Sequence, residues 1–167
     1  VDISFSVPEI TGVWPALWMM PEKSVYGNWP RSGEIDIVET INEKSDELVT
    51  TIHYGHDYHR QISKTTFLNQ LTKLSNPIDH NKISLIWEDE YFEWLLNDQL
   101  VFKVNFNEVE NLEPSPFLEE FYLLINVAVG GNWPGTPNST MYCNSRKSCP
   151  DVKKLIVDYI AYYEKIN

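Results

Sequence analysis

The sequence has 167 residues, enough for one domain with a sizeable hydrophobic core. Hydrophobic residues make up 43% and charged residues 22%, as in globular proteins, and no apolar run reaches the ~20 residues that a membrane-spanning helix needs. Because the formal net charge is −11, nucleic acid and anionic membrane surfaces are poor partners, whereas a neutral ligand is compatible with this charge.

Alternation of apolar and polar residues predicts an all-β protein. Val1, Ile3, Phe5 and Val7 alternate with polar residues, as in a half-buried strand, and Pro8 ends the pattern. Many short strands separated by turns predict a sandwich or jelly roll. Seven further strands are predicted, with Gly, Pro or Asn turn signals between them: 33–40, 48–54, 82–87, 91–96, 100–105, 122–129 and 155–163.

Four segments refine this topology. The residues Asn97-Asp98-Gln99 predict a hairpin connection between two strands, and 116–121 predicts one helical turn. The run 122–129 is apolar on both faces, which predicts a central strand covered on each side. The strand 155–163 alternates more loosely and is expected to end the chain inside a sheet.

The first strand begins at Val1 without a lead-in. A strand at that position needs pairing partners, and a sandwich of about eight strands leaves sheet edges uncovered. We therefore expect residues 1–167 to form a single domain that lacks N-terminal strands.

The segment GEIDIVET carries the strongest chemical signal. Residues i and i+2 of a strand point to the same face, so Glu34 and Asp36 are expected side by side. Glu39 falls on the opposite face of a regular strand, and a β-bulge near Ile37-Val38 would return it to the first face. The sequence therefore predicts a bulge there and three carboxylates in one row.

Two carboxyl groups flanking a bond are what glycoside hydrolysis needs, one as proton donor and one as nucleophile. Like charges raise the pKa of the group that must stay protonated, so Glu39 is expected to keep a proton while Glu34 is ionised. Asp36, between them, is expected to share a proton or hydrogen bond with Glu34. The spacing of three acids is equally compatible with a solvated acidic strand, but the β-forming, aromatic and Gly residues around it favour a site.

Histidine and tryptophan residues lie near this segment. In HYGHDYH, strand alternation sends His53 and His56 to opposite faces, which argues against a metal cluster. We expect His53 to be a polar neighbour of the carboxylates, and His56 and His59 to be loop residues. Of Trp14 and Trp18, we expect Trp18 to lie in the core.

Cys143 and Cys149 lie six residues apart in a polar stretch, where a short-loop disulfide is plausible. The glycosylation sequon at 138–140 comes just before them. Both features favour a secreted, extracellular protein in an oxidising environment.

Five motifs together carry a family resemblance: GVWPALWMMP, NWPRSGEIDIVET, TIHYG, FYLLINVAVGGNWPG and IVDYIAYYE. Their content and order resemble glycoside hydrolase family 16, in its laminarinase-type branch, along nearly the whole chain. The extra residue between Asp36 and Glu39 is similar to the bulged subgroup, which is mostly active on β-1,3-glucan.

The resemblance implies a retaining endo-glycosidase that hydrolyses laminarin-like β-1,3-glucan, and mixed-linkage glucan as a second substrate, by double displacement. It implies a jelly-roll sandwich of two curved antiparallel sheets with a concave substrate cleft, and a monomer that needs no cofactor for catalysis. It also implies a structural calcium ion, although the family's further calcium ligands lie on strands that are absent at the start of this chain.

Roles follow from the resemblance residue by residue. The implied catalytic residues are the nucleophile Glu34, the assisting acid Asp36 and the general acid/base Glu39. Asp158 matches a calcium ligand on the convex face. Five residues are implied to bind substrate. Trp29 and Arg31 match positions that line the family's negative subsites, and His53 matches a histidine near the acid/base. Asn132 and Trp133 match a loop on the glycone side.

Three alternatives remain open. A transglycosylase on the same scaffold uses the same covalent intermediate and passes the sugar to another sugar. A non-catalytic β-glucan-binding protein is the second, although such relatives have lost catalytic carboxylates that this chain keeps. The third is an inactive fragment whose sandwich is too incomplete to hold the site.

Overall fold

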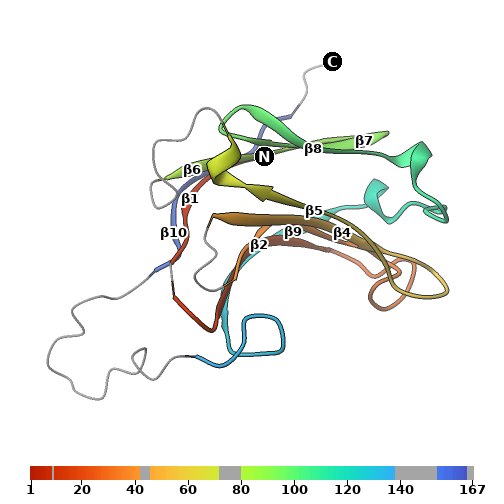
Figure 1. Ribbon diagram of the computed structural model, residues 1–167. Helices are drawn as coiled ribbons and strands as arrows, with labels where there is room; N and C mark the ends of the chain where they lie inside the picture. The colour runs from red at the N-terminus through yellow and green to blue at the C-terminus, as the bar shows by residue number, and fades with distance from the viewer. Residues whose placement is uncertain (9, 42–45, 72–79, 138–153, 165–167) are drawn as a thin grey trace, which may run out of the picture.

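Two five-stranded antiparallel sheets face each other in the computed structural model, which describes residues 1–8, 10–41, 46–71, 80–137 and 154–164 (Figure 1). One sheet has the order β10 (Ile156–Ala161), β1 (Asp2–Ser6), β6 (Asn81–Glu88), β7 (Tyr91–Leu96) and β8 (Gln99–Asn105). The other has the order β5 (Arg60–Phe67), β4 (Glu47–Tyr54), β3 (Glu34–Glu39), β2 (Val13–Pro21) and β9 (Phe121–Val129).

This arrangement confirms the predicted all-β sandwich of two antiparallel sheets. Three single 3₁₀ turns complete the described elements: Leu68–Gln70, Phe106–Glu108 and Pro116–Leu118. The last of these is the predicted helical turn. The predicted hairpin is also confirmed, because Asn97 and Asp98 connect β7 to β8 with φ of 50° and 65°, the left-handed conformation of a two-residue hairpin turn. No helix among these residues is long and apolar enough to cross a membrane.

Two strands were not predicted from the pattern. Pro15 lies inside β2, and a proline argues against a strand in the middle of a sheet because it has no N–H to donate. Here Pro15 lies at the end of the pairing with β3, where its carbonyl accepts a hydrogen bond from the Thr40 N–H at 3.2 Å. The other strand, β5, is a polar edge strand with too few apolar residues to show alternation.

The core lies between the sheets and is rich in aromatic rings. Phe92 is fully buried and lies at the centre of one cluster, with ring centroids 5.0 to 5.5 Å from those of Trp87, Trp94, Phe106 and Phe117. Edge-to-face pairs in this range add to the roughly 1.5–3 kcal/mol that burial of each such side chain contributes. This cluster supports the sandwich from the sheet opposite β3.

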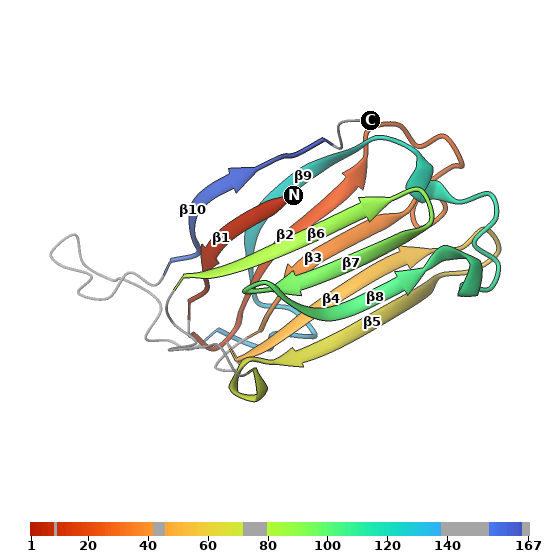
Figure 2. The ribbon, with the colours of Figure 1, turned by 90° about the horizontal axis from the view of Figure 1, so that it is seen from above.

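The prediction that segment 122–129 is covered on both faces is wrong. Among the described residues, β9 lies at the edge of its sheet and pairs with β2 alone (Figure 2). Ile125, Val127 and Val129 are 42%, 38% and 60% exposed, although residues such as Ile125 lie opposite buried positions of β2. An edge strand has no neighbour on one side, and an apolar run alone does not distinguish an edge from a centre. β10 is likewise an edge strand, not an interior one.

The expectation of strands before Val1 stays a prediction. Within the described residues, β1 has a partner on each side, β10 and β6, so the first strand is itself paired. Cys143, Cys149 and the sequon at 138–140 lie outside the described residues, and the disulfide also stays a prediction.

Candidate active site

The backbone of β3 brings three acidic residues to one face of their sheet. Between the pairs Asp36–Trp18 and Glu39–Ala16, β3 has two residues where β2 has one. The register with β4 shifts at the same place. The predicted bulge is therefore confirmed, and it restores to Glu39 the face that Glu34 and Asp36 share. The apolar residues between the acids point into the core and are at most 2% exposed: Ile35, Ile37 and Val38.

Gly33 sets the entry of the chain into β3. Its φ is +83°, which a residue with a side chain rarely adopts. A Cβ atom at this position would lie 3.1 Å from the rings of both Phe117 and Phe121. A glycine before Glu34 is thus required by the backbone and by the packing beneath it.

His53 joins the carboxylates from β4. It lies directly opposite Glu34, and its Nε2 is 3.0 Å from Oδ2 of the buried Asp36. One oxygen each of Glu34 and Asp36 and one nitrogen of His53 lie within 4.8 Å of one another. The expectation that His53 is a polar neighbour of the acids is confirmed. Among the described residues, this is the group that could hold a metal ion, but Oδ2 of Asp36 is already in contact with Nε2 of His53.

Each outer carboxylate accepts a hydrogen bond from an indole. Trp29 Nε1 donates to Oε2 of Glu34, and Trp14 Nε1 donates to Oε1 of Glu39 at 2.8 Å. A donor of this kind stabilises the ionised carboxylate and fixes its rotamer. Glu34 and Glu39 are therefore held from opposite flanks of the acidic row.

The two outer carboxylates differ in how firmly they hold a proton. Burial, followed by the charge of Asp36, raises the pKa of Glu39 to about 8. Burial and Asp36 also raise the pKa of Glu34. At both residues the charge of His53 and an indole hydrogen bond, from Trp29 to Glu34 and from Trp14 to Glu39, act against the rise. The larger shift belongs to Glu39, so Glu39 keeps its proton at a pH at which Glu34 is ionised. The arrangement provides one acid and one anion on one surface.

The raised pKa of Glu39 predicts a pH-dependent stability. The folded protein binds this proton more tightly than the unfolded chain, so its stabilising effect is complete below pH 4.5 and is lost as the pH rises to about 8. Glu39→Gln should therefore have a higher Tm than the wild type at pH 9, and a difference that shrinks at pH 5. The measurement is thermal unfolding at both pH values, with the exposed Glu22→Gln as control. An equal difference at both would show that Glu39 is not buried as an acid.

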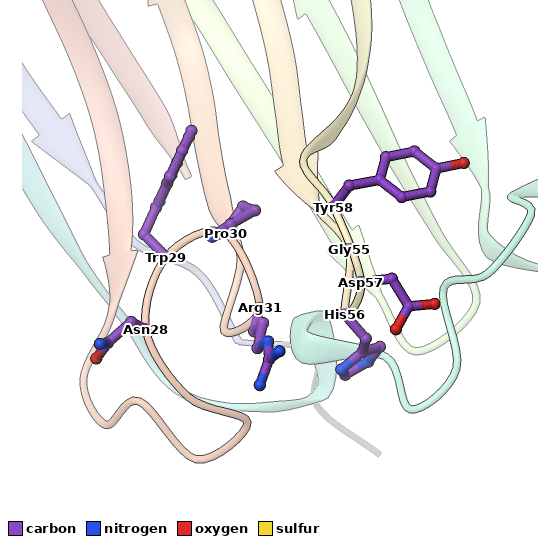
Figure 3. Close-up of a pocket in the computed structure, with 8 residues that line it drawn as sticks. All are labelled: Asn28, Trp29, Pro30, Arg31, Gly55, His56, Asp57 and Tyr58. Atoms are coloured by element: carbon purple, nitrogen blue, oxygen red, sulfur yellow. The ribbon is translucent and has the colours of Figure 1, made fainter.

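The other expected binding residues lie in two places. Trp29 and Arg31 are exposed and line a pocket of about 330 Å³ between loop 28–31 and loop 55–58 (Figure 3). Trp133 is 40% exposed and packs edge-on against Trp14, with ring centroids 4.9 Å apart and planes at 87°. Asn132, next to it, is exposed. Trp29 therefore lies beside Glu34, to which it donates, and Arg31 lines the same pocket as Trp29. Trp133 lies beside the indole that donates to Glu39.

Asp158 does not by itself form a calcium site. It is exposed on β10, and it belongs to no group of three or more histidine, cysteine or acidic side chains among the described residues that could hold a metal ion. Calcium takes six to eight oxygen ligands, so one carboxylate does not fit. Calcium binding rests on the resemblance alone and stays a prediction.

The sequence-based prediction for Trp18 is wrong, and the sequence pattern did not indicate the contacts of Trp14 and His59. Trp18 is not in the core: it lies opposite Asp36, on the same face as the acids, and its Nε1 donates to Oδ1 of Asn126 at 2.7 Å. Had β2 been recognised as a strand, alternation would have placed Trp14 and Trp18 together on this face. His59, expected in a loop, bonds to His53 at 2.7 Å, a contact that no local pattern signals.

Comparisons with known proteins agree with this geometry. The family model "XgeA-like, catalytic GH16 domain" matches residues 1–85. The chain is 34% identical to glucan endo-1,3-beta-glucosidase A1 of Niallia circulans, over 99% of this chain and 24% of that protein. It is 36% identical to glucan endo-1,3-beta-glucosidase of Cryptopygus antarcticus, over 77% of this chain and 49% of that protein.

A solved structure matches as well. The laminarinase catalytic domain of Thermotoga maritima MSB8 superimposes with a TM-score of 0.72 at 30% identity, over 83% of this chain and 56% of that one. The chain thus spans about a quarter to a half of these curated relatives and little more than half of the solved domain. From these matches and the bulged acidic strand, the chain belongs to glycoside hydrolase family 16, in its laminarinase-type branch.

Proposed function

We propose that this protein hydrolyses internal bonds of β-1,3-glucan with retention of configuration, with mixed-linkage glucan as a second substrate. The observation that carries the proposal is the row of Glu34, Asp36 and Glu39 on one face of β3, in which each outer carboxylate accepts a hydrogen bond from an indole. The raised pKa of Glu39, about 8, agrees with a role as the proton donor. The protein's relatives, endo-1,3-β-glucosidases and a laminarinase, support the substrate class.

In the first step, protonated Glu39 gives its proton to the glycosidic oxygen while the Glu34 carboxylate attacks the anomeric carbon. The bond to the leaving sugar breaks, and a covalent ester forms between Glu34 and the remaining glucan. Because Trp14 donates to Oε1 of Glu39, that oxygen serves as the acceptor, and the acidic proton is carried on Oε2.

In the second step, Glu39 acts as base. The ester removes the negative charge of Glu34, and Glu39, now ionised, takes a proton from the incoming water as the water attacks the anomeric carbon. Glu34 leaves as a carboxylate, which Trp29 Nε1 and the His53 charge stabilise. Asp36 lies between Glu34 and Glu39 in the acidic row, with its Oδ2 3.0 Å from Nε2 of His53. This contact between Asp36 and His53 adjusts when Glu34 loses and regains its negative charge.

Exposed aromatic rings at the site suit a sugar chain. Trp29 and Trp133 are 49% and 40% exposed, and the flat apolar faces of indoles pack on the C–H faces of sugar rings. We assign Trp29 and Arg31, and Asn132 and Trp133, to substrate binding next to Glu34 and Glu39 respectively.

We further propose a secreted monomer with a Cys143–Cys149 disulfide and a structural calcium ion. Support for secretion and the disulfide comes from the sequence: two cysteines in a short polar loop and a sequon before them. Asp158 would supply one calcium ligand, and other oxygen ligands would have to complete the site.

The test is release of reducing sugar from laminarin, with mixed-linkage glucan and xyloglucan in parallel. We expect laminarin to be the best substrate and short oligosaccharides to be the products. Products longer than the substrate, formed when oligosaccharide acceptors are added, would instead indicate a transglycosylase. Laminarin binding without turnover would indicate a recognition protein and would overturn the proposal.

Replacing Trp14 with Phe should shift the pH dependence of hydrolysis. The variant keeps a ring against Trp133 but loses the N–H that stabilises ionised Glu39, so the pKa of Glu39 rises further. We expect the basic limb of kcat/KM to move to higher pH, and kcat at the optimum to fall about fivefold, the effect of one lost hydrogen bond. The measurement is a pH–rate profile on laminarin.

Trp18→Phe is the matched control, since Trp18 lies on the same strand and face but donates to Asn126. Its basic limb should coincide with that of the wild type. If both variants shift the limb equally, the hydrogen bond to Glu39 is not the cause.

A further inference from the structure

His59 makes a hydrogen bond to His53 that the mechanism above does not use. The two facing nitrogens, His53 Nδ1 and His59 Nε2, are 2.7 Å apart. Their ring planes differ by 28° and the centroids are 5.0 Å apart. This separation matches an in-plane bond between two nearly coplanar imidazoles, because rings stacked face to face with nitrogens at this distance would have closer centroids.

The surrounding residues fix the place of His59. The Trp29 ring, which itself bonds Glu34, lies 4.7 Å from the His59 ring and 5.9 Å from the His53 ring. The loop that carries His59 turns tightly at Gly55, whose φ is +121° and where a Cβ would overlap the Tyr58 carbonyl oxygen. His59 is exposed to solvent but is thereby held against Trp29 and His53.

Proton positions follow from this contact. Two facing nitrogens hold one proton between them, so either His59 donates to a bare His53 Nδ1, or His53 donates to a bare His59 as the charged ring or as the neutral Nδ1–H tautomer. In the first two arrangements His53 carries a proton on Nε2, the nitrogen 3.0 Å from Oδ2 of Asp36. The opposite neutral tautomer of His53 would turn a lone pair toward a carboxylate.

The groups facing this pair agree with that assignment. Burial opposes the charged form of His53, but Asp36, Glu34 and Glu39 together raise its pKa. Burial and then the charge of His53 lower the pKa of His59. The first proton taken up by the pair is therefore held by His53, nearest the carboxylates.

We propose that His59 is a positioning residue for the hydrolysis, which holds the His53 ring in plane and presents its Nε2 proton to Asp36. The proposal rests on the function proposed above, since only a reaction at Glu34 makes the protonation of Asp36 and His53 matter. His59 touches neither the outer carboxylates nor, in this assignment, the sugar; it acts through His53.

The test compares two substitutions at the same position. His59→Phe keeps a flat ring against Trp29 but cannot bond to His53. His59→Gln gives up the ring but places an amide, able to donate or accept, near the former Nε2. We expect kcat on laminarin to fall about tenfold in His59→Phe with KM changed less than twofold, and to recover to within about threefold of the wild type in His59→Gln.

A second readout does not depend on turnover. Nitrogen-15 NMR of the imidazoles should show His53 protonated on Nε2 in the wild type and in His59→Gln, and a mixture of tautomers in His59→Phe. An unchanged His53 tautomer in His59→Phe would overturn the proposal, as would equal loss of kcat in both variants, which would indicate ring packing alone. If the tautomer changes but no variant, wild type included, cleaves a glucan, the tautomer assignment stands and the proposed function fails.

Discussion

Glu34→Gln is expected to lower kcat on laminarin by at least about 10⁴-fold, because an amide cannot form the covalent ester that carries the reaction. Binding should remain. Glutamine has the same shape, its carbonyl oxygen still accepts the Trp29 hydrogen bond, and Trp29 and Arg31 are untouched. The measurements are release of reducing sugar and calorimetric titration with a laminari-oligosaccharide. Retained turnover would remove Glu34 from the mechanism.

Chemical rescue then identifies the role. In Glu34→Gly, a small anion such as azide or formate can enter the space of the missing carboxylate and attack the anomeric carbon in its place. We expect azide to restore turnover of an activated aryl glucoside and to give an α-glycosyl azide, the inverted product. In Glu39→Gly, the variant at the acid/base position, azide is expected to give a β-glycosyl azide instead. An α-azide from Glu39→Gly and a β-azide from Glu34→Gly would exchange the two roles.

The second large effect is expected at Glu39. Glu39→Gln cannot protonate the leaving oxygen or activate water, so kcat/KM on laminarin should fall by roughly 10³-fold, within the range of general acid–base catalysis. With an aryl glucoside whose leaving group needs no proton, the first step should survive and the glycosyl-enzyme should accumulate as a burst. Loss of both steps with both substrates would place Glu39 outside proton transfer.

The raised pKa values also predict the direction in which activity changes with pH. Wild-type activity should rise as Glu34 ionises, above the ordinary carboxyl range because its pKa is raised, and fall as Glu39 loses its proton near pH 8. The limbs are properties of the coupled cluster and not of single residues. In Glu39→Gln with the activated glucoside, the basic limb should disappear while the acid limb remains.

The local sequence pattern predicts those features of the structure whose physical cause is itself local. Alternation with period two marks strands such as β1 and β7, because the apolar side chains on one side of each are buried in the core. The same rule, with one bulge, predicts that Glu34, Asp36 and Glu39 share one face, as the register of β3 confirms. Asn97 and Asp98 predict the hairpin turn that they form, because both residue types tolerate the left-handed backbone conformation that this turn needs.

The rest depends on contacts between residues distant in the chain. The sequence by itself determined the sandwich class and the acidic row. Only the tertiary structure decided that β9 is an edge, that Pro15 lies inside a strand, and which partner each acid has. Trp14 reaches Glu39 across 25 positions and Trp18 reaches Asn126 across 108, and such pairings arise from sheet register. The pKa of Glu39 likewise depends on burial, which the packed sandwich creates and no segment alone contains.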